Sequence, residues 1–321
     1  MSLRLAKVVC VVVQVMLSCT LGAQEYPTRP IRLISPFPPG GYNDILSRIV
    51  GQKLTEAWKQ QVVVESRAGA NMIIGTELVA KAPPDGYTIL MSASTHTINP
   101  SLYKLPYDSI KDFTPIILVA SNPIIFAVHP SVQAQTVKEF IALARSRSEQ
   151  FNYASFGSGS NSHLAGELFN RAAGINMVHI PYKGASSAII AIVAGEVQVY
   201  FGSLASVYPH VRSGKLRAFG VASSQRSGAA PDLPTIIEAG VPGFDVSGWY
   251  AILGPSGIPK IIVQKINSEV QRILELPDVK ERLLRDGADP LGGTPEQLAE
   301  TMRANMVKWA QAVKESGAKV D

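Results

Sequence analysis

The chain has 321 residues, of which 46% are hydrophobic and 17% charged, and its formal net charge is +5. This length supplies enough apolar residues for a large core and favours two lobes over one. The small positive charge comes without a cluster of Lys and Arg interleaved with aromatic residues, which argues against nucleic-acid binding.

The first 23 residues are typical of a secretory signal peptide. Arg4 and Lys7 give a basic start, an apolar stretch runs from Val8 to Met16, and small residues follow up to Ala23. The apolar stretch is too short to cross a bilayer. We therefore expect export after cleavage near Ala23. A retained membrane anchor, or a lipid anchor at Cys19 behind a poor lipoprotein box, is a minor alternative.

Both cysteines, Cys10 and Cys19, lie in this leader. The mature chain is therefore expected to have no disulfide, no cysteine metal ligand and no cysteine nucleophile.

Strands and helices alternate along the rest of the chain. Ile31–Ser35 is a short apolar strand, a Pro/Gly turn follows over 36–41, and an amphipathic helix begins at Asn43 or Asp44. Further strands are expected at 62–65, 87–92, 116–120, 124–128, 152–156, 178–181, 197–201, 216–222 and 246–253, and further helices at 75–81, 137–145, 164–173, 185–194, 204–213 and beyond 259. This alternation predicts an α/β protein with mainly parallel sheets flanked by helices.

Two sheets in two lobes are expected. Residues 24–121 and 249–321 together would form the first lobe, and residues 122–248 would form the second. The chain would then cross between the lobes near 120–123 and near 248–251. Two crossing strands with little else between the lobes act as a hinge.

Four turns at strand ends are rich in glycine and hydroxyl residues, and each precedes a helix. They lie at 38–43, 155–162, 182–186 and 202–206. Ligands of open α/β sheets bind beyond the carboxyl ends of the strands, and the N–H groups of a helix N-terminus attract anions. The first turn belongs to the first lobe and the others to the second, so the pattern suits a dicarboxylate held between them. Ordinary helix capping is the alternative for any one turn.

Several side chains near these turns have two interpretations. Asp44 is expected to be a helix N-terminal carboxylate rather than a ligand group, and His163 to be packed or capping. Lys183 either neutralises a carboxylate or is a solvated loop residue. Tyr42 is either a lid or selector side chain or an exposed turn residue.

Six segments together resemble the Bug family, the extracytoplasmic solute receptors of tripartite tricarboxylate transporters. They are, in chain order, PFPPGGYND, APPDGYTIL, HTINPSLYKLPYD, YASFGSGSNSHLAGELF, HIPYKGASSAI and PHVRSGKLRAFGV. The resemblance implies a type II periplasmic-binding-protein fold that closes on its ligand like a flytrap. It also implies a periplasmic receptor, which we expect to be monomeric, that needs no cofactor and captures a small carboxylate. The ligand would be a di- or tricarboxylate, an acidic amino acid or an aromatic acid, and the partners would be the membrane permease subunits.

The resemblance assigns ligand-binding residues to both lobes. Carried onto this sequence, they are Phe37, Pro39, Gly40, Gly41, Tyr42, Asn43, Thr95 and His96 in the first lobe, and Ser155, Gly157, Gly159, Ser160, Asn161, Lys183, Gly184 and Ser203 in the second. Binding is expected through backbone amides, hydroxyl groups and waters. This chain departs from the family at Tyr42, where a small residue is usual, and at 69–75, where the usual loop is richer in Gly and Asn.

The sequence carries no motif of a hydrolase or a metal enzyme. It has no G-x-S-x-G and no H-E-x-x-H, and its histidines, at 96, 129, 163, 179 and 210, lack paired ligand spacing. We therefore expect no catalytic residue and no metal site. An exported hydrolase is the less favoured alternative, and a ligand sensor that signals to a membrane partner would use the same fold.

Overall fold

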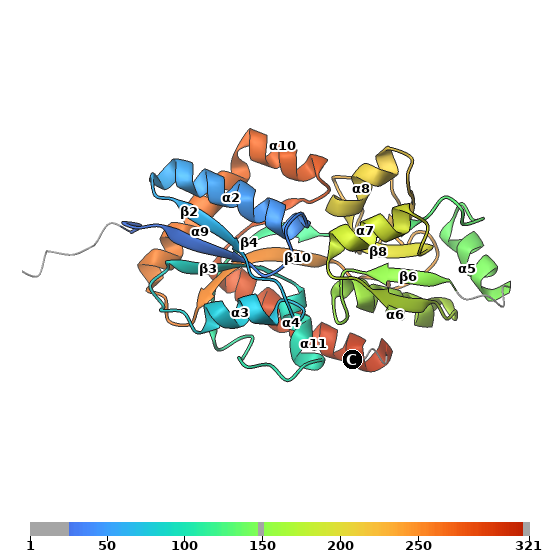
Figure 1. Ribbon diagram of the computed structural model, residues 1–321, viewed down its shortest axis with the longest axis horizontal. Helices are drawn as coiled ribbons and strands as arrows, with labels where there is room; N and C mark the ends of the chain where they lie inside the picture. The colour runs from blue at the N-terminus through green and yellow to red at the C-terminus, as the bar shows by residue number, and fades with distance from the viewer. Residues whose placement is uncertain (1–25, 147–150, 317–321) are drawn as a thin grey trace, which may run out of the picture.

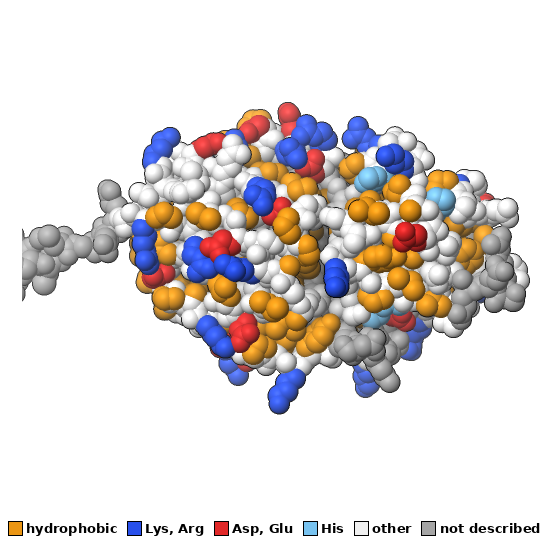
Figure 2. Space-filling view, viewed as in Figure 1, with side chains coloured by type: hydrophobic (Ala, Val, Ile, Leu, Met, Phe, Trp, Pro, Cys, Tyr) orange, Lys and Arg blue, Asp and Glu red, His pale blue; other side chains and the backbone are white. Residues whose placement is uncertain are grey.

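The computed structural model describes residues 26–146 and 151–316. The expected signal peptide, residues 1–23, lies outside the described residues. Figure 1 shows two lobes side by side, each built on its own sheet. On the face shown in Figure 2, Lys and Arg side chains are spread over both lobes rather than gathered in one patch. Within the described ranges, no helix combines the length and apolar character needed to cross a membrane.

The first lobe has a six-stranded sheet with the strand order β11-β4-β10-β3-β1-β2. The strands are β1 (Ile31–Ser35), β2 (Val62–Ser66), β3 (Thr88–Ala93), β4 (Phe113–Asn122), β10 (Gly248–Pro255) and β11 (Pro290–Gly292). One face is covered by α2 (Tyr42–Trp58), α9 (Lys260–Glu275) and α10 (Pro277–Arg285), and the other by α3 (Ile73–Ala80) and the first half of α11 (Pro295–Ser316). Both faces are buried, and β3 is accordingly buried along its whole length.

The second lobe has a five-stranded sheet with the order β7-β6-β8-β5-β9. Its strands are β5 (Ile124–Val128), β6 (Asn152–Ser155), β7 (Val178–Pro181), β8 (Val199–Ser203) and β9 (Arg217–Val221). Helices α5 (Val137–Ser146) and α6 (Asn161–Ala173) pack on one face, and α7 (Ala185–Val193) and α8 (Leu204–Arg212) on the other. A group of phenylalanine rings centred on Phe126 fills the first of these interfaces.

Both sheets are mixed, whereas mainly parallel sheets were expected. β10 runs antiparallel to β3 and β4, and β5 runs antiparallel to β8 and β9. Each of these strands enters its sheet from the other lobe instead of following a helix of its own lobe. The crossover helix that keeps successive strands parallel is therefore missing at these two positions.

The two crossing strands lie side by side at the boundary between the lobes. β4 ends at Asn122, Pro123 follows, and β5 begins at Ile124, while Gly248 at the start of β10 pairs with Asn122. This is the two-strand hinge that the sequence predicted.

Helix α11 makes a third link between the lobes. Leu298 and Met302 pack in the first-lobe core, whereas Trp309 and Ala312 pack in the second-lobe core. The expected division gave all of 249–321 to the first lobe, but the second half of this helix lies against the second.

Candidate ligand-binding site

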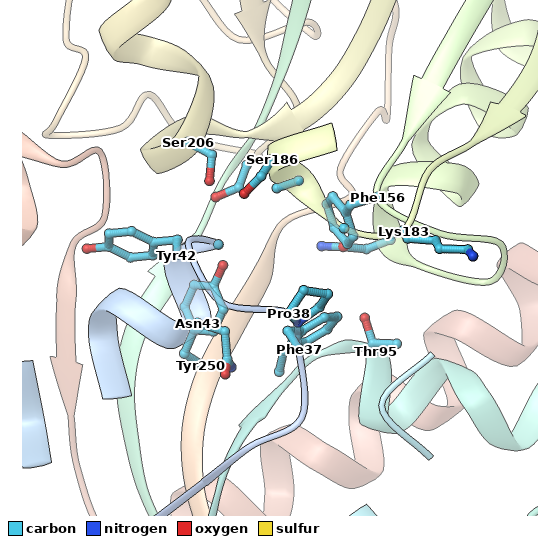
Figure 3. A pocket seen from close by; sticks show the side chains of 16 residues that line it. Phe37, Pro38, Tyr42, Asn43, Thr95, Phe156, Lys183, Ser186, Ser206 and Tyr250 are labelled. Carbon is cyan, nitrogen blue, oxygen red and sulfur yellow. The ribbon is translucent and has the colours of Figure 1, made fainter. Parts of the chain in front are cut away.

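The two lobes enclose a pocket at the carboxyl ends of their strands, which we call the main pocket (Figure 3). The first lobe and hinge line it with Phe37, Pro38, Gly41, Tyr42, Asn43, Ala93, Thr95 and Tyr250, and the second lobe with Phe156, Asn161, Lys183, Gly184, Ala185, Ser186, Ser203 and Ser206. A neighbouring side pocket shares Phe37, Pro38, Phe156, Lys183 and Gly184 with it and extends to Ala68–Met72, Tyr103, Gly157, Ser158 and Tyr182.

The turn between β1 and α2 is held in shape by its own side chains. Gly40 has a φ of +84°, and its N–H donates to Asp44 Oδ2 at 3.2 Å. Arg48 Nε donates to the same oxygen at 3.1 Å. Asp44 is therefore a structural carboxylate of the helix start, as its position in the sequence indicated.

Asn43 uses its side chain to join α2 to the sheet. Its Oδ1 accepts a hydrogen bond from Ser35 Oγ at 2.9 Å, and its Nδ2 donates to the Met91 carbonyl at 3.0 Å. What Asn43 offers the main pocket is therefore its backbone at the start of α2.

Five helices begin at the main pocket. Two of them are α6, whose first residue is Asn161, and the short helix α4 (Thr95–Ile98), whose first residue is Thr95. The other three are α2 in the first lobe, and α7 and α8 in the second. Their N-cap residues are Gly41, Gly184 and Ser203, and none of the three makes a side-chain capping hydrogen bond. The first N–H groups of a helix have no partner within the helix, and the helix dipole makes this end positive. Donors and positive potential from both lobes therefore converge on one small space. The N–H of Leu204, the first residue of α8, is an exception among these donors, because it donates to the Pro123 carbonyl at 2.8 Å.

Buried polar side chains add to these donors. Asn161 is 1% exposed, and neither its Oδ1 nor its Nδ2 has a hydrogen-bond partner among the described residues. Ser203 is 3% exposed, and its hydroxyl group lies near that of Tyr250. Burial raises the pKa of the Tyr250 hydroxyl, and the Ser203 hydroxyl offsets part of that rise in pKa.

The walls of the main pocket are mostly apolar. Phe37 and Pro38 form one side, and Phe156 faces them from the second lobe (Figure 3). Of the described residues that line the two pockets, Lys183 is the one with a charged side chain, and it extends away from the centre of the main pocket.

Tyr42 forms part of the wall of the main pocket. Its ring packs against Tyr250 with centroids 5.7 Å apart, it is 3% exposed, and it belongs to the first-lobe core. The hydroxyl end points away from the pocket (Figure 3), and burial raises its pKa. It is therefore not the exposed turn residue considered from the sequence, and its role as a lid or selector side chain stays a prediction.

Nine of the 16 residues expected to bind ligand line the main pocket. They are Phe37, Gly41, Tyr42, Asn43, Thr95, Asn161, Lys183, Gly184 and Ser203. Gly157 lines the side pocket. The remaining six line neither pocket: Pro39, Gly40, His96, Ser155, Gly159 and Ser160.

His96 lies in the short helix α4 (Thr95–Ile98) rather than at a strand end. It is fully buried, its Nε2 bonds to the Ser109 carbonyl at 2.8 Å, and Phe113 packs edge-on against its ring. Burial lowers the pKa of His96 to about 4. Because α4 turns the chain after Thr95, Thr95 borders the pocket while the next side chain enters the core of the lobe.

Hydrogen bonds to other residues of the second lobe hold the Gly157–Ser160 turn in place. Ser155 Oγ bonds to His179 Nε2 at 2.7 Å, and Ser160 Oγ caps α6 by accepting from His163 N at 3.2 Å. The His163 and His179 rings stack with centroids 3.8 Å apart, and burial lowers the pKa of His163 to about 4. Neutral His163 accepts the Gly159 N–H at Nδ1, at 3.0 Å.

Gly40, in the turn at 38–43, and Gly159, in the turn at 155–162, each face the opposite lobe, but neither contacts the turn of the other. A Cβ on Gly40 would lie 3.4 Å from Ser186 Oγ, whereas one on Gly159 would lie 2.9 Å from Leu102 Cδ1. Tyr103 Oη also donates to the Ser158 carbonyl at 3.0 Å. The Gly157–Ser160 turn therefore contacts the first lobe beside the main pocket.

Seven further lining residues were not expected: Pro38, Ala93, Phe156, Ala185, Ser186, Ser206 and Tyr250. Pro38, Phe156, Ala185, Ser186 and Ser206 fall inside the four turns that the sequence singled out. Extending the predicted site over each turn and the first helical turn behind it would have included them. Ala93 is the last residue of β3, and Tyr250 lies opposite it on β10 because these two strands pair antiparallel.

Comparison with solved structures defines the class of this fold. The chain is similar to the R. palustris protein Rpa4515, solved with adipate, with a TM-score of 0.88 and 32% identity over 92% of this chain and 100% of that one. It is also similar to MatC from Rhodopseudomonas palustris with bound malate, with a TM-score of 0.84 and 31% identity over 90% and 100% of the two chains. The protein therefore has the two-lobed type II periplasmic-binding-protein fold.

Residues 46–318 match the model of the tripartite tricarboxylate transporter family receptor, and the chain belongs to that family. BugT of Bordetella pertussis is 36% identical over 95% of this chain and 94% of its own length. The "UPF0065 protein in tcbD-tcbE intergenic region" of Pseudomonas sp. strain P51 is 37% identical over 90% of this chain and 87% of its own length. The family is one of solute-binding receptors.

Proposed function

We propose that this protein is a periplasmic receptor that binds a small carboxylate in the main pocket and delivers it to the membrane permease subunits of a tripartite tricarboxylate transporter. The observation that carries the proposal is the convergence of the uncapped starts of α2, α7 and α8 on one pocket between two hinged lobes. Three positive helix ends stabilise an anion without a charged side chain in contact with it. The adipate and malate in the structures of relatives are consistent with this ligand class.

Both lobes contribute helix ends to the binding of the ligand. α2 begins on the first lobe, and α7 and α8 begin on the second, so an anion between them contacts both lobes at once. A ligand that contacts both lobes shifts the equilibrium between the open and closed forms toward the closed form, by as much as its binding free energies to the two forms differ. Delivery to a permease then requires that the lobes separate again, which involves the strands β4 and β10 and also α11, because this helix packs on both lobes.

The proposal is tested by thermal unfolding of the mature protein with a panel of acids that includes adipate, malate, aspartate and benzoate. The protein is first unfolded and refolded to remove any acid that co-purifies. A ligand at about 100 times its dissociation constant adds about 2.7 kcal/mol to the free energy of unfolding, which corresponds to a melting-temperature rise of roughly 5 °C for a chain of this size. An unchanged melting temperature with every acid contradicts carboxylate binding.

Two further measurements separate a transport receptor from the alternatives. The bound acid is expected to be recovered chemically unaltered after long incubation, whereas a hydrolase would convert its substrate. Cells that lack this receptor are expected to take up the labelled acid more slowly. Normal uptake without the receptor would contradict delivery to a permease.

A further inference from the structure

The most unusual group in the main pocket is the side chain of Asn161. It is the first residue of α6 and is 1% exposed, and both of its amide atoms lack partners within the described chain. Its counterpart across the cleft, Asn43, is also buried but has both amide atoms bonded inside the first lobe. Buried polar atoms are paired in the great majority of cases, so Asn161 is built to pair with something that enters the pocket.

The side chain of Asn161 is held in place at the base of the cleft. Gly248, the first residue of β10, lies against it, and a Cβ on Gly248 would be 2.7 Å from Asn161 Nδ2 and 2.4 Å from Ser94 Oγ. Ser94 is 1% exposed, and its Oγ also lacks a partner among the described residues. This crowding by the hinge strand fixes the amide where it meets the pocket.

The chemistry of a carboxamide sets what the ligand must offer. Nδ2 is a donor and Oδ1 is an acceptor. A carboxylate only accepts hydrogen bonds, so it satisfies Nδ2 or the helix N–H groups but leaves Oδ1 unpartnered. Full satisfaction of Asn161 therefore requires a donor on the ligand in addition to the carboxylate.

The electrostatics of the pocket select the kind of donor. An ammonium group would lie beside three positive helix ends, and among the described residues neither pocket has an acidic lining residue to neutralise it. A hydroxyl group donates and accepts without charge, so it suits both Asn161 and the Ser203 hydroxyl. The walls formed by Phe37, Phe156 and Tyr250 suit a carbon skeleton between the carboxylate and the hydroxyl.

We infer that the ligand of this receptor is a hydroxycarboxylic acid, and that Asn161 selects it by accepting a hydrogen bond from its hydroxyl group. This rests on the proposed function and narrows it. It favours hydroxy acids over acidic amino acids and over acids that carry only carboxylates.

The test compares matched acids that differ by one hydroxyl group, namely malate with succinate and 4-hydroxybenzoate with benzoate, by isothermal titration calorimetry on refolded protein. The hydroxylated member of at least one pair is expected to bind at least about tenfold more tightly, since a site built around a hydroxyl group penalises its absence. Asn161→Leu is expected to abolish this preference. Asn161→Asp keeps the acceptor, so it is expected to retain the preference while weakening all acids through repulsion.

Stability of the ligand-free protein supplies an independent measurement. Because Asn161 has no partner to lose, Asn161→Leu is expected to melt at or above the temperature of the unsubstituted protein. A lower melting temperature would indicate a structural role and would contradict the inference.

The inference and the proposed function fail in different ways. Equal affinities within both pairs would overturn the inference and leave carboxylate binding intact, with an ordered water as the partner of Oδ1. Persistence of the preference in Asn161→Leu would also overturn it. Absence of binding by all four acids and by the wider panel would overturn the proposed function as well.

Discussion

The substitution Gly159→Ala adds one methyl group at a place where the two lobes are in contact, so it tests how the lobes close. It lies in the second lobe with a φ of +77°, and a Cβ there would lie 2.9 Å from Leu102 Cδ1, 3.1 Å from Tyr103 Cε2 and 3.2 Å from Asn71 Nδ2. All three neighbours belong to the first lobe. Gly159→Ala is therefore expected to impede closure without entering the main pocket.

The expected free-energy cost of Gly159→Ala has two parts, of which one affects folding and the other affects ligand binding. The left-handed backbone costs alanine about 1 kcal/mol whether the lobes are open or closed, so it lowers stability but cancels in binding. The three contacts are shorter than the ordinary 3.5–4.0 Å or so between non-bonded atoms and exist only when the lobes touch. Crowding of this kind costs about 1–3 kcal/mol, which corresponds to roughly 5- to 150-fold weaker binding.

Gly214→Ala is the matched control for this experiment. Gly214 has a φ of +73°, and a Cβ there would meet nothing within 4 Å. It is expected to lower the free energy of unfolding by about the same 1 kcal/mol and to leave affinity unchanged. Calorimetry with the tightest-binding acid of the panel measures both variants. Unchanged affinity in Gly159→Ala, or an equal loss in Gly214→Ala, would refute the reasoning.

Two further predictions concern stability. Burial holds the pKa of His96 at about 4, below its ordinary value. Neutral His96 therefore contributes fully to the free energy of unfolding above about pH 6.5, and this contribution is lost as the pH falls toward 4, with a loss of about 2 kcal/mol at about pH 5. His96→Gln should reduce this loss, and an unchanged dependence of stability on pH in the variant would contradict the prediction. Trp309 is 0% exposed in the second-lobe core, so Trp309→Ala should lower the free energy of unfolding in urea by about 3–5 kcal/mol. The control is Val307→Ala, at a residue that is 72% exposed on the same helix, and it should change this free energy by no more than about 0.5 kcal/mol. Similar losses in both variants would show that α11 does not fasten the lobes.

Local patterns in the sequence located most of the pocket. The rule that ligands bind at strand ends identified the turns around Gly41, Gly184 and Ser203, which do begin helices at the main pocket. This rule succeeded because a strand, a turn with glycine or serine, and the start of a helix follow one another directly in the sequence at each of these sites. No long-range information was needed.

The positions that could not be predicted depend on tertiary packing. Gly159 resembles an anion-binding glycine in sequence, but its neighbours Leu102 and Tyr103 come from a distant segment. His96 follows a pocket residue, yet a helical turn directs it into the core. The antiparallel course of β10, and with it Tyr250, depends on which lobe the chain arrives from.

The central claim is that uncapped helix ends hold a carboxylate in the main pocket, and its charge dependence tests that claim most directly. The measurement is calorimetry of the refolded protein with the tightest-binding acid of the panel and with the analogue in which every carboxylate of that acid is replaced by a primary amide, which has a similar shape and lacks the negative charge. Charge-assisted hydrogen bonds are about twice as strong as neutral ones, so the acid is expected to bind at least about tenfold more tightly. Equal affinity for the acid and its amide would contradict the account.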